Sequence, residues 1–176
     1  MYEDGDDLTH GQIDYFLERM DSGEEVETDS DVHRLMTAAS ERAMRITSHM
    51  NATFVSLSDT HAQLERLFMR PLPEGVDLFP PFTTDCGLNT HLGADVFINA
   101  GCRFQDQGGI HIGDRALIGH NCVIATLNHN MDPARRANLL PAPVHIGADA
   151  WLERNRTARR DHRRGRGRGG GRGRDP

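Results

Sequence analysis

The sequence of 176 residues contains no lysine, only three cysteines and no long apolar run. A membrane-spanning helix needs about 20 consecutive apolar residues, and the acidic residues 1–7 lack the apolar stretch of a secretory signal peptide. We therefore expect a cytoplasmic protein without membrane attachment. Cys86, Cys102 and Cys122 are too few and too scattered for a disulfide scaffold, and no Cys/His cluster has the spacing of a structural zinc site. We therefore expect no bound metal.

Because lysine is absent, arginine carries the fixed positive charge, and it is concentrated at one end of the sequence. Residues 152–176 contain ten arginines and three acidic residues, a net charge of +7, whereas residues 1–151 have a net charge of −13. Such an acidic body repels the phosphates of nucleic acids. The basic end can attract polyanions through charge alone, so we expect no specific nucleic-acid partner.

The N-terminal part of the sequence predicts three helices. Apolar residues spaced three and four apart favour an amphipathic helix over residues 11–21, and similar stripes favour a second over 30–50 and a third over 60–69. A group of prolines between residues 71 and 81 then ends helix formation. We expect residues 1–70 to form an acidic, α-helical N-terminal segment.

From residue 92 onward the apolar residues recur with a period of six, with a two-residue insertion and one longer gap. The residues in this register are Leu92, Ile98, Phe104, Ile110, Ile112, Ile118, Ile124, Ile146 and Leu152. Neither a helix nor an ordinary strand has this period, but a parallel β-helix does, because each hexad forms one flat side and three hexads form one coil. An ordinary β-meander with coincidental spacing is the alternative, and so many residues in register disfavour it. We expect the β-helix to cover residues 71–152.

Three segments then carry a family resemblance. Residues 92–102 (LGADVFINAGC), 110–122 (IHIGDRALIGHNC) and 143–152 (PVHIGADAWL), with Asn128-His129 before the last of them, resemble the maltose/galactoside O-acetyltransferases, a hexapeptide-repeat group that includes the nodulation acetyltransferase. The resemblance implies a mainly β fold, in which an α-helical N-terminal segment precedes a left-handed parallel β-helix. It also implies a homotrimer with sites between subunits, and transfer of acetyl from acetyl-CoA to a hydroxyl of a sugar or related small molecule.

The longer gap in the register predicts a loop that leaves the prism at residues 128–143. Ile124 and Ile146 are 22 residues apart, which is not a multiple of six, and loops on rigid scaffolds are frequent sites of function. The resemblance places the catalytic histidine of the family at His129. A neutral imidazole can accept the proton of a hydroxyl group as the oxygen attacks a thioester. The alternative is a solvated loop histidine without a catalytic role.

The resemblance also suggests residues that contact the two substrates. Asn99 and Asp106 match positions that bind the acceptor sugar, and an amide with a carboxylate can bind vicinal hydroxyls through paired hydrogen bonds. The alternatives are a corner residue that stabilises its own turn at Asn99 and a solvated acid at Asp106. Asp29 is the nearest match, one residue out of alignment, to an acid that the N-terminal region contributes. Trp151 matches a tryptophan near the acyl-donor groove, although a purely structural aromatic fits its position as well.

The hexad pattern stops after Leu152, where the family continues with about five more hexads that build the groove for coenzyme A. Residues 153–176 are rich in Arg and Gly and contain no aliphatic residue beyond an alanine, so we expect them to be disordered. They are either a genuine polyanion-binding tail or the product of a reading-frame shift after about residue 152. Read one base later, GC-rich codons for residues 160–175 can encode VTIGEGAVVGAGAVVT, which has the missing hexads.

Two functions therefore remain open at the level of sequence. The first is an acetyl-CoA-dependent O-acetyltransferase, weakened or inactivated in this chain by the loss of its last coils. The second is a non-catalytic β-helical remnant or interaction module that uses its Arg/Gly end to bind polyanions.

Overall fold

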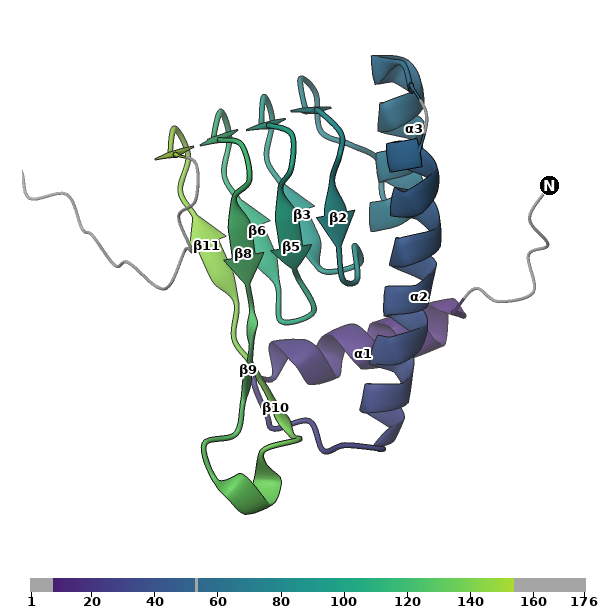
Figure 1. Cartoon of the computed structure of the whole chain (residues 1–176), viewed down its shortest axis with the longest axis vertical. Helices are drawn as coiled ribbons and strands as arrows, with labels where there is room; N and C mark the ends of the chain where they lie inside the picture. The colour runs from purple at the N-terminus through teal and green to yellow at the C-terminus, as the bar shows by residue number, and fades with distance from the viewer. Residues whose placement is uncertain (1–7, 53, 154–176) are drawn as a thin grey trace, which may run out of the picture.

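The computed structural model describes residues 8–52 and 54–153 (Figure 1). The three predicted helices are present as α1 (His10–Asp21), α2 (Asp31–Ala52) and α3 (Leu57–Phe68). Helix α1 begins with a capping box, in which the side chains of Thr9 and Gln12 each bond to the other residue's backbone N–H. No helix in the described ranges is long and apolar enough to span a membrane.

Short strands follow the helices. Their bounds are β1 (Asp77–Leu78), β2 (Thr83–Thr84), β3 (Thr90–Leu92), β4 (Phe97–Ile98), β5 (Arg103–Gln105), β6 (Ile110–Ile112), β7 (Leu117–Ile118), β8 (Val123–Ala125), β9 (Leu127–His129), β10 (Leu139–Pro141), β11 (Val144–Ile146) and β12 (Trp151–Leu152). Consecutive strands enter different sheets, in the orders β1-β4-β7-β12, β2-β5-β8 and β11-β6-β3, and all pairs in these sheets are parallel. This arrangement is a three-sided parallel β-helix.

Residues one coil apart are 20 positions apart rather than 18. Leu78 pairs with Ile98, and Ile98 pairs with Ile118. Two sides of each coil take six residues, and the third takes eight, as between Phe104 and Ile112. The two-residue insertion seen in the sequence is therefore a regular feature of one corner.

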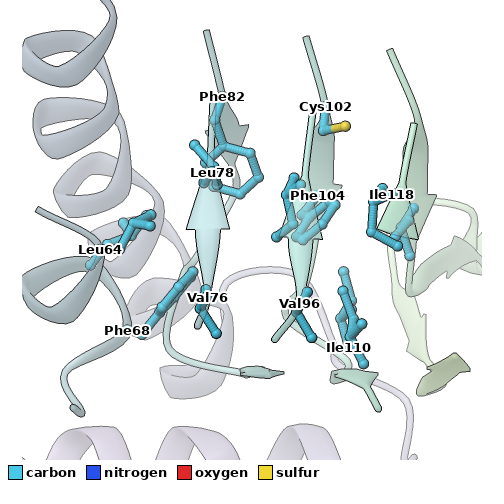
Figure 2. Packing of buried hydrophobic residues seen from close by; sticks show 14 of the residues in the cluster. Leu64, Phe68, Val76, Leu78, Phe82, Val96, Cys102, Phe104, Ile110 and Ile118 are labelled. Atoms are coloured by element: carbon cyan, nitrogen blue, oxygen red, sulfur yellow. The ribbon is translucent and has the colours of Figure 1, made fainter. Parts of the chain in front are cut away.

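The predicted register residues line the interior of the prism. Phe104, Ile118 and Ile124 are almost completely buried, and Phe82 meets Phe104 edge to face with ring centroids 5.0 Å apart (Figure 2). Each such side chain contributes about 1.5–3 kcal/mol on leaving water. Cys102 is also completely buried and fills a corner, where burial raises its thiol pKa to about 11, so it serves packing rather than nucleophilic chemistry.

The helices cover one end and one side of the prism (Figure 1). Helix α2 packs beside β2, and the N-terminal helices pack against one another. A second apolar cluster joins Phe16 and Met20 of α1 to Cys86 and Leu88 of the first coil. The N-terminal segment is thus packed onto the β-helix through its own hydrophobic core.

The predicted loop at residues 128–143 is a β-hairpin. Strands β9 and β10 pair antiparallel, and between them lies a short 3₁₀ helix, Pro133–Arg135. The hairpin leaves the prism at the eight-residue corner, so the excursion adds 14 residues to that side. The Arg/Gly-rich end, apart from residue 153, lies outside the described residues.

Candidate active site

His129 ends strand β9 and is exposed on the hairpin. Its Nδ1 lies 2.9 Å from the backbone carbonyl oxygen of Arg136. A carbonyl oxygen can only accept a hydrogen bond, so Nδ1 carries a proton and donates it. In the neutral ring this leaves the lone pair on Nε2, which is the arrangement that a general base requires.

The chain segment before α2 holds the hairpin as a third extended segment. Val26 forms an antiparallel bridge with Leu139, and Leu139 pairs on its other side with His129. The carboxylate of Glu25 accepts hydrogen bonds from Asn130, Asn138 and Arg135, all of which belong to the hairpin. The bonds from Asn138 and Asn130 lower the pKa of Glu25.

The structure places Asp29 in the turn before α2. It is exposed in a left-handed conformation (φ 62°), and its backbone carbonyl accepts a hydrogen bond from Arg34. The N-terminal acid that reaches the hairpin is Glu25. Sequence reasoning missed Glu25 because it lies in an acidic run where no spacing sets one carboxylate apart.

The structure corrects the prediction that Asp106 binds the acceptor. Its carboxylate is completely buried and accepts four hydrogen bonds, from the hydroxyls of Thr84 (2.5 Å) and Thr90 (2.7 Å) and from the backbone N–H groups of Cys86 and Gly87 (2.9 Å each). Burial raises its pKa, against the bonds that lower it. With no exposed surface, Asp106 fixes the turn of the preceding coil and is not available to bind an acceptor.

Two neighbours of Asp106, the exposed Asp85 and the buried Gln107, bond to one another. Asp85 follows β2 at the end of the sheet from which the hairpin departs, and it is exposed. Partial desolvation raises its pKa, although a hydrogen bond from the side chain of Gln107 opposes the rise. Among the described residues, the Oε1 atom of Gln107 is buried and has no hydrogen-bond partner, and such an atom calls for an explanation.

Asn99 lies far from His129 within one chain. It precedes β5 by four residues, whereas His129 follows β8 by four, and these two strands are parallel neighbours. The two side chains therefore belong to opposite ends of the sheet β2-β5-β8 (Figure 1). Asn99 is half-buried, and its Oδ1 accepts a hydrogen bond from the backbone N–H of Ala100 at 3.0 Å, as the corner alternative predicts.

Comparison with known proteins shows acetyltransferases that are similar to this chain in fold and in sequence. A maltose O-acetyltransferase from Clostridium difficile 630 superposes with a TM-score of 0.70 at 26% identity, covering 78% of this chain and 73% of that one. A hexapeptide-repeat acetyltransferase from Vibrio cholerae, solved with acetyl coenzyme A, has a TM-score of 0.61 at 26% identity and covers 79% and 78%. Nodulation protein L from Rhizobium leguminosarum bv. viciae is 42% identical over 80 residues, which are 44% of this chain.

The chain resembles the hexapeptide-repeat acetyltransferases in both sequence and fold. The expected fold class, a left-handed parallel β-helix preceded by α-helices, is thereby confirmed. No protein-family model matches the sequence. The chain spans only 42% of the length of nodulation protein L.

Trp151 contributes to an apolar row on the outside of this acetyltransferase-like prism. It is 69% exposed and pairs with Leu117, which is 47% exposed, in the sheet β1-β4-β7-β12. Phe97 continues the row and meets Phe79 edge to face at 5.2 Å. The exposed indole is free to contact a ligand, and its assignment to the donor groove stays a prediction.

A third face of the prism presents a ladder of histidines. The rings of His91, His111 and His145 stack along the coils with centroids 4.6 Å apart, at angles of 7° and 13°, beside an open groove of about 350 Å³. Arg70 donates to His91 Nδ1 at 2.5 Å, and His91 Nε2 lies 2.9 Å from Asn89 Oδ1. Among residues 8–52 and 54–153, no three His, Cys, Asp or Glu side chains are placed to hold a metal ion.

Proposed function

We propose that the chain is an acetyltransferase that moves an acetyl group from acetyl-CoA to a hydroxyl of a sugar or related small molecule, with His129 as the general base. The observation that carries the proposal is the hydrogen bond from His129 Nδ1 to the carbonyl of Arg136, which leaves Nε2 to accept a proton. Two proteins of similar structure support it, since one is a maltose O-acetyltransferase and the other is an acetyltransferase solved with acetyl coenzyme A.

The reaction needs two proton transfers, one to the imidazole of His129 and one from it. His129 Nε2 takes the proton of the acceptor hydroxyl while its oxygen attacks the thioester carbonyl, and the carbon–sulfur bond then breaks. The imidazolium returns the proton to the departing thiolate. This scheme requires no covalent enzyme intermediate, which agrees with the complete burial of Cys86, Cys102 and Cys122.

Acceptor binding is proposed for Asp85, supported by Gln107, and for Asn99. Because Asn99 and His129 lie at opposite ends of one sheet, a site that uses both requires two copies of the chain. A homotrimer with sites between subunits meets this requirement. The exposed ring of Trp151 is proposed to contact the acyl donor.

The test is acetyl transfer to a panel of mono- and disaccharides by the wild-type chain and by His129→Ala. Loss of a general base reduces kcat by about 10²–10⁴-fold, and His49→Ala, which removes an exposed histidine of α2, should leave the rate unchanged. Full turnover by His129→Ala would refute the assignment of the base. The same variants are made with the reading frame shifted by one base near codon 153, because that chain restores the hexads expected to form the donor groove.

The second candidate, a non-catalytic interaction module, makes a different prediction. A folded chain that neither binds acetyl-CoA nor transfers acetyl in either reading frame would favour it over the enzyme.

A further inference from the structure

We infer that Glu25 is a positioning residue for His129: its carboxylate fixes the hairpin so that the imidazole keeps its proton on Nδ1. The inference rests on the base role proposed above, and it adds a residue from the N-terminal segment that touches neither substrate nor the reacting atoms. Glu25 is separated from its hairpin partners by more than 100 residues of sequence.

Glu25 binds both arms of the hairpin at once. Its Oε1 accepts from Asn130 Nδ2 at 2.8 Å and from Asn138 Nδ2 at 2.9 Å, and its Oε2 accepts from Arg135 Nη1 at 2.9 Å. Asn130 directly follows His129, whereas Asn138 directly precedes Leu139, the residue paired with His129. A single carboxylate thus closes the loop across its base. Hydrogen bonds to an ionised acceptor are stronger than neutral ones, and the bonds from Asn138 and Asn130 favour the ionised form of Glu25 by lowering its pKa.

The same contacts help to fix the segment that carries the carbonyl of Arg136, together with the backbone bonds of the hairpin itself. Arg136 lies between Arg135 and Asn138, and Glu25 holds the side chains of both. The Arg136 carbonyl is the acceptor for His129 Nδ1–H. If that carbonyl turns away, the hydrogen bond that favours the proton on Nδ1 is lost. The neutral tautomer of His129 with its proton on Nε2 can then form. The lone pair would then be on the nitrogen that faces Arg136.

The fold does not depend on Glu25 alone. Val26 and Leu139 exchange backbone hydrogen bonds of 2.8 and 3.0 Å, and the backbone N–H of Thr28 donates to Asn138 Oδ1 at 3.2 Å. These bonds remain when the side chain of Glu25 is removed. We therefore expect Glu25→Ala to fold with the hairpin attached but less ordered.

The experiment measures the tautomer of His129 by ¹⁵N NMR of the full chain, because this readout is independent of activity. The wild type should show a proton on Nδ1, Glu25→Ala should show a mixture of tautomers, and Glu25→Gln should lie between them because its amide oxygen still accepts from Asn130 and Asn138. Glu27→Gln is the matched control, since it removes the same charge two residues away on an exposed side chain. An unchanged tautomer in Glu25→Ala would overturn the inference.

Kinetics then separate this inference from the proposed function. Glu25→Ala should lower kcat about tenfold, a loss smaller than that from removing the base itself. In a His129→Ala background, Glu25→Ala should cause no further loss, and an additive loss would show that Glu25 acts elsewhere. A shifted tautomer in a chain whose rate is insensitive to His129→Ala would instead refute the base and leave the structural role of Glu25 intact.

Discussion

Acid should destabilise this protein through His91, the first ring of the histidine ladder. Asn89 Nδ2 donates to Asp21 (2.9 Å) and to the carbonyl of Gln107 (3.1 Å), so the amide oxygen of Asn89 faces His91 Nε2 and accepts a hydrogen bond from its N–H. Nδ1 then has to accept from Arg70. Both ring nitrogens of neutral His91 therefore have a hydrogen-bond partner. A second proton, on Nδ1, would point an N–H group at the guanidinium of Arg70.

The size of the effect follows from the pKa. Burial, with Arg70 and His111 as the facing cations and Asp21 as the opposing anion, lowers the pKa of His91 from 6.5 to about 4. Between about pH 6.5 and 4 the unfolded chain therefore binds a proton at His91 that the folded chain does not bind. The free energy of unfolding falls as the pH drops through this interval. One pKa unit corresponds to about 1.4 kcal/mol, and solvent screening at this half-buried site reduces the total to about 1–2 kcal/mol.

The assay is urea unfolding at about pH 7 and about pH 4.5, at one protein concentration, for the wild type and His91→Gln. Glutamine does not titrate, so the variant should lose about 1–2 kcal/mol less free energy of unfolding over this interval than the wild type. Asp106 contributes with the opposite sign, because its raised pKa favours the folded state in acid, but it is present in both proteins and cancels. Equal losses in the two proteins would refute the role of His91.

Two further predictions concern the prism itself. Phe104→Ala should lower the free energy of unfolding by about 3–5 kcal/mol in urea, because it removes a completely buried ring and leaves a cavity against Phe82. Gly113→Ala should lower it by about 1–3 kcal/mol, since the new Cβ would lie 2.5 Å from the backbone nitrogen of Ala148. Gly147→Ala, which meets nothing within 4 Å, is the matched control and should change stability by less than about 0.5 kcal/mol. If Gly147→Ala lowered the free energy of unfolding as much as Gly113→Ala, the contact with the backbone of Ala148 would not be the cause of the loss.

The prism could be predicted from the sequence because its signal is local and repeated. Each inward side chain recurs at a fixed spacing, so a short window already shows the period. The first coil lies within the expected range of 71–152, but its apolar register could not be recognised before Leu92, and the reason is physical. Thr84 occupies the inward position in register with Phe104 and Ile124, and a polar residue there breaks the apolar pattern. The hydroxyl is satisfied by Asp106, one coil later.

The site was harder to predict because its contacts join residues that no pattern connects. In the sequence Gln105-Asp106-Gln107, nothing indicates which side chain turns inward. The structure shows that the side chain of Asp106 turns inward, where its carboxylate accepts hydrogen bonds from the hydroxyls of Thr84 and Thr90 in the preceding coil. Glu25 is separated from its partners Asn130 and Asn138 by 105 and 113 positions of sequence. A pattern along the sequence records neither relation, whereas His129 could be proposed as the base because it matches a family motif.

The position of His129 also explains why the N-terminal helices belong to the site. The rungs of the prism fix one another through parallel pairing and a shared core, whereas the hairpin extends beyond those rungs. Besides the pairing of β9 with β10, the hairpin is held by the bridge between Val26 and Leu139 and by the carboxylate of Glu25. That segment is in turn anchored by α1, whose Phe16 and Met20 are buried against the first coil. The N-terminal segment therefore supports the proposed catalytic base directly, in addition to covering one end of the β-helix.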